Sequence, residues 1–331
     1  MNQESKTDLA SLDAWITAAN SNGAVAVLCG KNGDMDTIGS AIALAAAIPN
    51  GLACGLHQDK VAKRICTQLN APFRFISQSS PNLPKKLGGI ICVDAAAPSQ
   101  IGIDLPASIP LCIIDHHATS DWTLGENDLE INWPARATTQ IIHQYLTEYS
   151  SNTLTDSVRR LLLAGLITDT GRFRHADKEA FVTAGNILTG SGIDYAEFIE
   201  SVETESITDS ERGAIAAGMA RVKSTKAGDW HLMHTYVGTN EGRMCRVLQI
   251  AGAEIALVSR HRDGQTRMSA RATRSATIRG VNLGHIMKSL AEKIGGEGGG
   301  HDGAAGWSGE SDRIAAESAF MHALSGIGVE E

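Results

Sequence analysis

Aspartate and histidine side chains follow several apolar segments of this chain, at the point where each segment stops. The triplet Asp115-His116-His117 comes directly after the apolar run 111–114. Other carboxylates stand at the ends of other apolar runs: Asp34, Asp36, Asp94 and Asp169. Carboxylate and imidazole ligands with little thiolate suit Mn²⁺ or Mg²⁺, and a pair of such ions can activate water for in-line displacement at phosphorus. The residues therefore predict a divalent-metal site whose natural reaction is hydrolysis of a phosphate ester.

Short apolar runs alternate with longer helical stretches up to about residue 192. The runs expected to be strands are 24–29, 52–56, 73–76, 90–93 and 111–114. Helical spacing of apolar residues marks 38–47, 138–149 and 157–166. The alternation is typical of βαβ units and predicts an α/β domain with a parallel sheet. Ligands bind beyond the carboxyl ends of the strands in such sheets, so one sheet edge would gather the aspartates and histidines.

The length of the chain indicates two domains. It has 331 residues, 43% of them hydrophobic, whereas single cores stop growing at roughly 250–300 residues. We predict a metal-binding catalytic domain at 1–193, a polar helical linker at 194–223 and a smaller substrate-binding domain at 224–331. In the last segment, strands are expected at 230–236, 254–259 and 265–271, and helices at 243–251 and 283–293. This order predicts an α+β domain with a mixed sheet.

The charge balance argues against a protein that holds long nucleic acid. The formal net charge is -8 at pH 7, and no run rich in Lys or Arg occurs. Proteins that bind long nucleic acids usually carry a basic stripe that releases counterions. A metal centre and a few basic side chains in a cleft still attract a small anion. We therefore expect a small anionic nucleotide or short oligonucleotide as the partner.

The cysteines and the apolar segments bear on the cellular compartment. None of the six cysteines belongs to a CxxC pair, and most stand inside apolar runs, which suits a reducing cytoplasm. No apolar stretch approaches the ~20 residues needed to cross a bilayer. We expect a cytoplasmic protein without a membrane segment. A homodimer is the default expectation for an oligomer, although no residue establishes one.

The order of the motifs resembles one known family. The series is Asp34-x-Asp36 with Gly39-Ser40, then Asp94, Asp115-His116-His117, Asp169-Thr170-Gly171 and finally Gly298-Gly299-Gly300-His301. Each motif alone is weak, but the ordered set is specific and spans nearly the whole chain. It resembles the DHH phosphoesterase superfamily. The layout is similar to the nanoRNase and phosphoadenosine-phosphate phosphatase branch, with a DHH-associated C-terminal domain, and is related to the longer RecJ exonucleases.

The resemblance implies a role for each acidic motif. The implied metal ligands are Asp34 and Asp94 for one ion, and Asp36, Asp94, His116 and Asp169 for the other, with Asp94 bridging. His117 would face the scissile phosphate, and Asp115 would orient a histidine rather than bind metal. The expected cofactor is a pair of Mn²⁺ ions, or Mg²⁺ or Co²⁺, with a bridging hydroxide as the attacking group.

One position departs from the family pattern. Family members commonly carry a histidine four residues before the first aspartate, and Gly30 stands there in this chain. The first ion therefore loses a ligand, which water, Asn32 or a residue from elsewhere would have to replace. Lys31 next to it is a candidate contact for a substrate phosphate. The alternative for Lys31 is a solvated loop lysine, since loop charges are usually exposed.

The second domain resembles the family's substrate-holding part. Arg271 at a predicted strand end would grip a second phosphate or a carboxylate. The run Gly298, Gly299 and Gly300 would form a loop that points backbone N–H groups at an anion, with His301 beside it. A clamp between the two domains would favour short substrates. Arg172 is a weaker candidate for a phosphate contact, because a surface ion pair explains it equally well.

Purely structural explanations compete with these roles. Aspartates after strands often cap helices or form turns, and Asp36 could cap a helix beginning near Thr37. The glycine run could be a helix C-cap after Lys293-Ile294. The repeated aspartates and the histidine pair, taken together, favour the site over capping.

The sequence supports one leading function and two rivals. The leading hypothesis is a metal-dependent phosphoesterase that acts on a phosphomonoester or short phosphodiester, such as short oligonucleotides or 3′-phosphoadenosine 5′-phosphate. A second hypothesis replaces this substrate by a cyclic dinucleotide or a small phosphorylated metabolite. The third is a nucleotide-binding regulator with weakened catalysis. Gly30 motivates both rivals.

Overall fold

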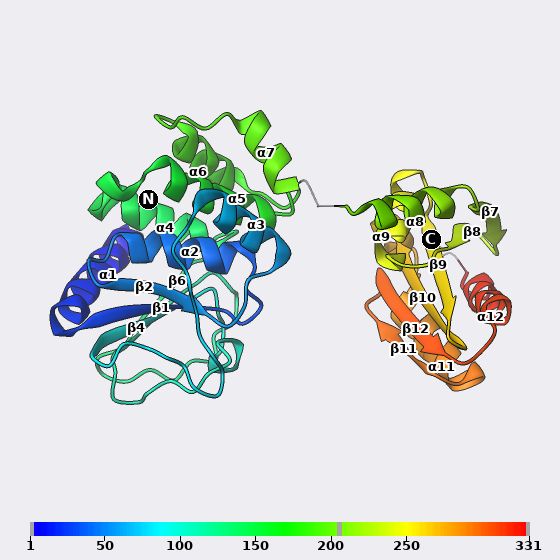
Figure 1. Ribbon diagram of the computed structural model, residues 1–331, viewed down its shortest axis with the longest axis horizontal. Helices are drawn as coiled ribbons and strands as arrows, with labels where there is room; N and C mark the ends of the chain where they lie inside the picture. The colour runs from blue at the N-terminus through cyan, green and yellow to red at the C-terminus, as the bar shows by residue number, and fades with distance from the viewer. Residues whose placement is uncertain (1–2, 204–206, 329–331) are drawn as a thin grey trace. The chain divides into compact units, whose positions relative to one another are not determined.

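The computed structural model describes residues 3–203 and 207–328. The chain divides into two compact units, residues 1–205 and residues 206–331 (Figure 1). Each unit buries hydrophobic cores of its own.

A six-stranded parallel sheet forms the centre of the first unit (Figure 1). Its strands are β1 (Ala24–Cys29), β2 (Gly51–Gly55), β3 (Arg74–Phe75), β4 (Leu87–Val93), β5 (Leu111–Asp115) and β6 (Leu129–Asn132). The strand order is β3-β2-β1-β4-β5-β6, and each neighbouring pair is parallel. The order reverses between β1 and β4, where open α/β sheets bind ligands at the carboxyl ends of the strands. The segments that carry Asp34 and Asp94 leave the sheet at this point.

Helices cover one face of this sheet. The helices of the unit are α1 (Gln3–Asn22), α2 (Met35–Ala46), α3 (Lys60–Leu69), α4 (Thr138–Tyr149), α5 (Asp156–Asp169), α6 (Lys178–Leu188) and α7 (Tyr195–Glu203), with short 3₁₀ turns at Pro98–Gln100 and Ser151–Thr153. α2 is buried along almost its whole length. It packs against α4 and α5 in the core that also takes Val25 and Val27 from β1.

The opposite face of the sheet is covered mainly by loops rather than by helices. Ala26 and Leu28 of β1 point to this face, because side chains alternate along a strand. They share a core with Ile101 and Ile103 from the loop after β4, and Trp122 from the loop after β5 packs against that core. Figure 1 shows these loops on the side of the sheet away from α2 and α4.

The second unit is a mixed sheet with helices. Its strands are β7 (Lys223–Ala227), β8 (Trp230–Tyr236), β9 (Ile255–Arg262), β10 (Gln265–Ala272), β11 (Glu297–Gly300) and β12 (Ala304–Gly309). Its helices are α8 (Asp209–Met219), α9 (Glu241–Ile250), α10 (Arg274–Ile278), α11 (Leu283–Ile294) and α12 (Arg313–Ser325). The strand order is β11-β12-β10-β9-β8-β7, in which β8 and β9 are parallel and the other pairs antiparallel.

The predicted fold class is confirmed: a parallel α/β sheet is followed by a smaller mixed-sheet α+β unit. The domain boundaries at 193 and 224 stay predictions. The segment predicted as a helical linker contains two helices, α7 and α8, which pack against different cores. Phe198 and Val202 of α7 enter the core of the first unit, whereas Gly218 of α8 faces Val237 and Met244 of the second.

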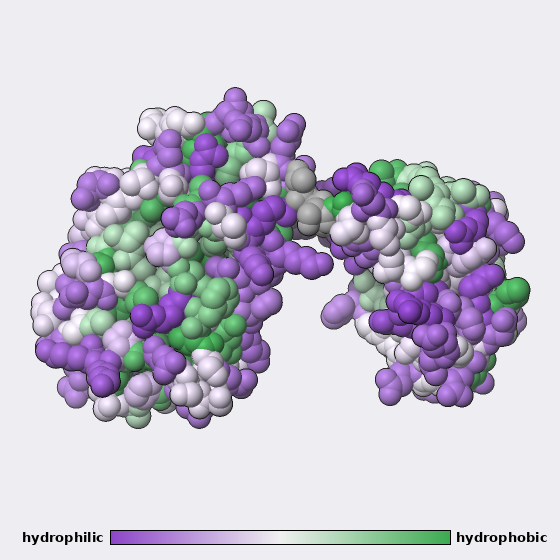
Figure 2. Space-filling model, viewed as in Figure 1, coloured by the Kyte–Doolittle hydropathy of each residue, from purple (hydrophilic) through white to green (hydrophobic). Residues whose placement is uncertain are grey.

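The outer surface mixes polar and apolar residues. Figure 2 shows hydrophilic residues over much of the visible face of each unit, interrupted by apolar patches. Within residues 3–203 and 207–328, no helix is both long and apolar enough to span a membrane. The predicted homodimer stays a prediction.

A buried histidine makes the first unit sensitive to acid. Burial, helped by the charge of Arg159, lowers the pKa of His143 in α4 to about 4. The unfolded chain takes up this proton near pH 6.5, so the free energy of unfolding should fall as the pH drops from 6.5 towards 4. We expect the contribution to reach about 3 kcal/mol, and His143→Gln to reduce the fall. Urea unfolding at pH 7.5 and 4.5 measures this fall in the free energy of unfolding, with His322→Gln at an exposed site as control. An equal fall in wild type and His143→Gln would contradict the assignment.

Candidate metal centre

The start of one helix fixes the carboxylate of Asp36. This residue lies in the first turn of α2 with 1% of its surface exposed. The backbone N–H groups of Thr138 and Thr139, at the start of α4, donate to its two oxygens at 2.7 and 2.9 Å. The first N–H groups of a helix have no partner within that helix and favour a negative charge. α4 therefore stabilises the buried Asp36 carboxylate and holds its orientation.

His116 lies at the centre of three carboxylates. Its Nδ1 donates to the carbonyl of Ala135 at 3.3 Å, which directs Nε2 towards the acidic groups. The Nε2 atom is 3.3 Å from Asp94 Oδ1, 3.6 Å from Asp169 Oδ2 and 4.0 Å from Asp36 Oδ2. A backbone carbonyl on the far nitrogen is one of the usual partners that orient a metal-binding histidine.

The backbone adopts left-handed conformations at Asp94 and just after Asp169. Asp94 follows β4 in the left-handed region, with φ 57°, which aspartate tolerates better than most residues. The hydroxyl of Thr138 donates to its Oδ1 at 3.3 Å. Asp169 is the last residue of α5, and the next turn contains Gly171 and Arg172, both at positive φ. Unfavourable backbone conformations thus adjoin two of the three carboxylates, as is common at functional sites.

The charges of the cluster fit a bound cation. Burial and the charge of Asp94 raise the pKa of Asp36 well above its ordinary value. Burial also raises the pKa of Asp169. Burial opposes the protonation of His116, yet the hydrogen bond to Asp94 and the nearby carboxylates raise its pKa to about 9. A divalent ion bound among these carboxylates would reduce the repulsion between their negative charges.

Among the residues that the structure describes, two sets of ligand atoms lie close enough together to hold an ion. One set comprises Asp36, His116 and Asp169, and the other Asp94, His116 and His117, with the ligand atoms of each set within 4.8 Å of one another. Oxygen and imidazole donors of this kind suit Mn²⁺ or Mg²⁺. The residues present therefore fit a divalent cation. The structure brings together four of the predicted ligands, Asp36, Asp94, His116 and Asp169.

Asp34 is engaged in local hydrogen bonds. It is the N-cap of α2, and its Oδ1 accepts from the N–H of Thr37 at 3.1 Å. Its Oδ2 accepts from the side-chain amide of Asn32 at 2.6 Å. The alternative that Asp36 caps this helix is wrong, because α2 begins at Met35 and Asp34 holds the cap position. Burial and the charge of Asp94 raise the pKa of Asp34 to about 6.

A side chain at position 30 has little room. A β-carbon built on Gly30 would lie 3.0 Å from Asn32 Oδ1 and 3.1 Å from the carbonyl of Asp94. The space next to Asp34 is therefore taken by Asn32 rather than by a histidine.

Substitution of Asp34 by serine distinguishes its role as a helix cap from a role as a metal ligand. Serine caps helices nearly as well as aspartate but carries no charge, whereas alanine does neither. We expect Asp34→Ala to lower the free energy of unfolding by about 1 kcal/mol relative to Asp34→Ser. If Asp34 binds an ion, both variants need more cation for half-maximal activity. Titration of activity with Mn²⁺ measures this, and an unchanged requirement in Asp34→Ser would restrict Asp34 to its cap.

Asp115 and His117 form a second pair beside the cluster. Asp115 is the last residue of β5 and is buried, whereas 43% of the His117 side chain is exposed. The Nδ1 of His117 donates to Asp115 Oδ1 at 2.7 Å. Asp115 Oδ2 is buried and has no hydrogen-bond partner among the described residues. The bond leaves His117 Nε2 as the free nitrogen of the ring.

Lys31 is exposed in the loop after β1. Its backbone N–H donates to the carbonyl of Gln100 at 2.6 Å, which ties this loop to the loop after β4. Both the phosphate contact and the solvated lysine fit this position, so the role of Lys31 stays a prediction.

Arg271 and His301 both neighbour Ala304 at one end of the second sheet. Arg271 on β10 pairs with Ala304 on β12. The N–H of His301 donates to the carbonyl of Ala304 at 2.9 Å. His301 is exposed and Arg271 is half-buried. The structure therefore places these two predicted substrate contacts on either side of one residue.

The glycine run is a strand and not the expected loop. Gly298, Gly299 and Gly300 belong to β11, the edge strand paired with β12. A β-carbon on Gly298 would lie 2.1 Å from the carbonyl of Met287, so close packing on α11 requires glycine. The C-cap alternative holds for Gly295 alone, which caps α11. Among the described strands, the backbone of β11 is paired on the β12 side only, and the role of these three glycines in substrate binding stays a prediction.

Sequence reasoning missed the groups that hold the ligands. Thr138 and Thr139 contact Asp36 across about a hundred residues of chain, and Ala135 contacts His116 through its backbone. The predicted helix at 138–149 was the available signal, since its start offers free N–H groups. Nothing in the sequence indicated which carboxylate would lie there.

Comparison with known families agrees with this geometry. The model of the DHH family N-terminal domain matches residues 24–166, and the model of the DHHA1 domain matches residues 238–325. The fold and the acidic site define a phosphoesterase that depends on a divalent metal. The chain belongs to the DHH superfamily and carries a DHHA1 domain as its second unit. The resemblance seen in the motifs is thus confirmed at the level of the superfamily, and the nanoRNase-like branch stays a prediction.

Two relatives extend along most of the chain. An uncharacterised protein of Methanocaldococcus jannaschii is 25% identical over 298 residues, which cover 87% of this chain and 88% of the relative. The structure of an exopolyphosphatase-related protein from Bacteroides fragilis has a TM-score of 0.59 at 16% identity, and the match covers 97% of this chain and 96% of that one. The structural likeness shows a shared fold.

Proposed function

We propose that this phosphoesterase hydrolyses a phosphomonoester or short phosphodiester of a nucleotide-sized substrate, such as a short oligonucleotide or 3′-phosphoadenosine 5′-phosphate. The observation that carries the proposal is the convergence of Asp36, Asp94 and Asp169 on His116 Nε2. The net charge of -8 supports a small substrate rather than a long nucleic acid.

The same cluster would hold the metal. Asp36, Asp94, His116 and Asp169 are the proposed ligands of one ion, and Asp34 and Asp94 of a second, weaker one. A bound divalent ion supplies a water of lowered pKa and neutralises charge on the phosphoryl group. Mn²⁺, Mg²⁺ and Co²⁺ are the candidates. The weaker second site follows from Gly30, which offers no ligand, and from the local hydrogen bonds of Asp34.

The remaining residues orient groups and hold protons. Asp115 keeps a proton on His117 Nδ1, so that Nε2 is free to face the scissile phosphate. The two N–H groups of Thr138 and Thr139 at the helix start hold the Asp36 carboxylate in place and favour its charged form against the larger opposing effect of burial. In the second unit, Arg271 and His301 are proposed to bind the non-scissile end of the substrate, with Lys31 as a further phosphate contact.

A substitution at Arg271 tests the substrate-holding role. Arg271→Gln should raise KM for a 5′-phosphorylated dinucleotide at least about tenfold with kcat little changed, because a hydrogen bond to a charged group contributes about 1.5–3 kcal/mol. Steady-state kinetics measure both constants. Arg262→Gln, on an exposed strand end, is the matched control. An unchanged KM would remove Arg271 from the substrate site.

One observation favours a second candidate function. Both oxygens of Asp34 already accept hydrogen bonds, and Gly30 adds no ligand beside it. A nucleotide-binding regulator with weakened catalysis would have this arrangement. Tight binding of a nucleotide without turnover in Mn²⁺, Mg²⁺ or Co²⁺ would support it.

A further inference from the structure

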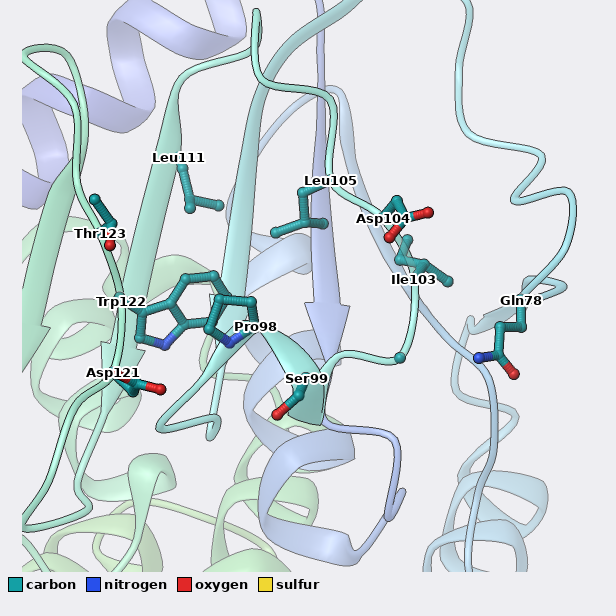
Figure 3. A pocket seen from close by; sticks show the side chains of 11 residues that line it. Gln78, Pro98, Ser99, Ile103, Asp104, Leu105, Leu111, Asp121, Trp122 and Thr123 are labelled. Atoms are coloured by element: carbon teal, nitrogen blue, oxygen red, sulfur yellow. The ribbon is translucent and has the colours of Figure 1, made fainter.

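A pocket of about 590 Å³ lies on the loop-covered face of the first sheet (Figure 3). Its walls come from the loop after β4, the loop after β5 and the start of β5, with Gln78 from the loop after β3. In Figure 3, Leu105 and Leu111 lie in the upper part of the pocket and Ser99 and Asp121 in the lower part. The ring of Trp122 lies between these two pairs. The volume is in the range of small-molecule sites, which are mostly apolar with a few polar groups.

The pocket walls are bonded to the backbone that carries the metal centre. The indole Nε1 of Trp122 donates to the carbonyl of Ala95 at 2.8 Å, one residue after Asp94. The N–H of Asp121 donates to the carbonyl of Ala96 at 2.7 Å. Asp121 is four residues from His117, so their separation is at most about 14 Å. Most of the pocket is thus built by the two loops that leave the ligand-bearing strand ends.

The lining selects a particular chemistry. The indole of Trp122 and the side chains of Leu105 and Leu111 give the pocket an apolar part that includes an aromatic ring, against which a planar ring can pack. Asp104 and Asp121 add carboxylates, which only accept hydrogen bonds. Of the described residues that line the pocket, none carries a positive charge. A phosphate is therefore disfavoured here, whereas a planar group with N–H donors fits.

We infer that this pocket binds the nucleobase of the substrate, and that it prefers guanine. Guanine presents two adjacent N–H donors on one edge, which match a carboxylate, and every base presents a face for stacking. Uracil presents a single ring donor and would bind less well. The inference rests on the proposed function, because it makes the base part of a nucleotide whose phosphate lies at the metal centre. Asp121 would recognise the base edge and Trp122 its face.

Nucleosides test the pocket without the metal centre. The full chain, stripped of metal, is titrated with guanosine, adenosine and uridine by calorimetry. We expect guanosine to bind most tightly, and Trp122→Ala to weaken it about tenfold, as expected for the loss of a stacking partner. Asp121→Asn, at an exposed position, should weaken the binding of guanosine and bring its affinity close to that of uridine. Asp263→Asn, an exposed aspartate of the second unit, is the control.

The outcomes separate the pocket from the proposed function. Absence of guanosine binding at millimolar concentration, or equal binding by wild type and Asp121→Asn, would overturn the pocket. Asp121→Asn keeps the test valid even if Trp122→Ala does not fold. Selective guanosine binding in a protein that hydrolyses no phosphate ester would uphold the pocket and refute the proposed function instead. For an active enzyme, kcat/KM should favour guanine-containing over uracil-containing dinucleotides, and Asp121→Asn should remove this preference.

Discussion

Replacing His116 by alanine should abolish phosphoester hydrolysis while the protein stays folded. His116 Nε2 faces three carboxylates, and both candidate ligand sets include this residue. The loss of partners that only orient a metal ligand already costs 10–100-fold, so removal of a shared ligand should lower kcat/KM by more than about 100-fold. The variant should also lose the rise in melting temperature that Mn²⁺ gives to the wild type. Mn²⁺ raises the melting temperature only if it binds to the folded state.

The control for His116 is a histidine with no proposed role. His322 is exposed on α12, and His322→Ala should keep both activity and the Mn²⁺-dependent melting shift. Far-UV circular dichroism checks that each variant is folded. Retention of the Mn²⁺ shift by His116→Ala would show that the ion binds elsewhere.

Asp36→Asn should have an effect of similar size for a different physical reason. Asparagine has nearly the same shape, but it loses the charge and turns an N–H₂ group towards one of the helix N–H donors of Thr138 and Thr139. One donor is then left without an acceptor, which costs about 1–3 kcal/mol. We expect activity to fall more than about 100-fold and the folded state to lose cation-dependent stability.

A comparison with and without cation separates these two effects of Asp36→Asn. The loss of the hydrogen bond should lower the melting temperature in the presence of a chelator as well as in Mn²⁺. The loss of the ligand should appear only as a missing Mn²⁺-dependent increase. Asp128→Asn, in the loop before β6, is a control outside the cluster. A full Mn²⁺-dependent increase in Asp36→Asn would contradict its role as a ligand.

The sequence predicted the sheet edge and its acidic groups because both depend on local pattern. β1 was placed at its observed bounds, since its six apolar residues form an uninterrupted run. Asp94 and Asp115 were expected at strand ends, and the parallel order of β4 and β5 puts them at one edge. The helix α4 was likewise placed at its observed bounds from its spacing.

Other parts of the molecule depend on contacts that local pattern does not encode. The strand β12 has the sequence AAGWSG, in which alanine and glycine have low strand propensity, and only its neighbours β10 and β11 hold it extended. The contact between Asp36 and the start of α4 links segments about a hundred residues apart. Asp34 shows the limit of motif reasoning, because the same carboxylate serves as a helix cap and as a predicted ligand.

The most direct test is metal-dependent turnover on a substrate panel. The metal-free protein is resupplied with Mn²⁺, Mg²⁺ or Co²⁺ and given 3′-phosphoadenosine 5′-phosphate, 5′-phosphorylated dinucleotides to pentanucleotides, a cyclic dinucleotide and simple sugar phosphates. Chromatography resolves the products. We predict release of mononucleotide or phosphate from the short nucleotide substrates only when a divalent ion is present. Hydrolysis of sugar phosphates alone, or no hydrolysis with any ion, would contradict the account.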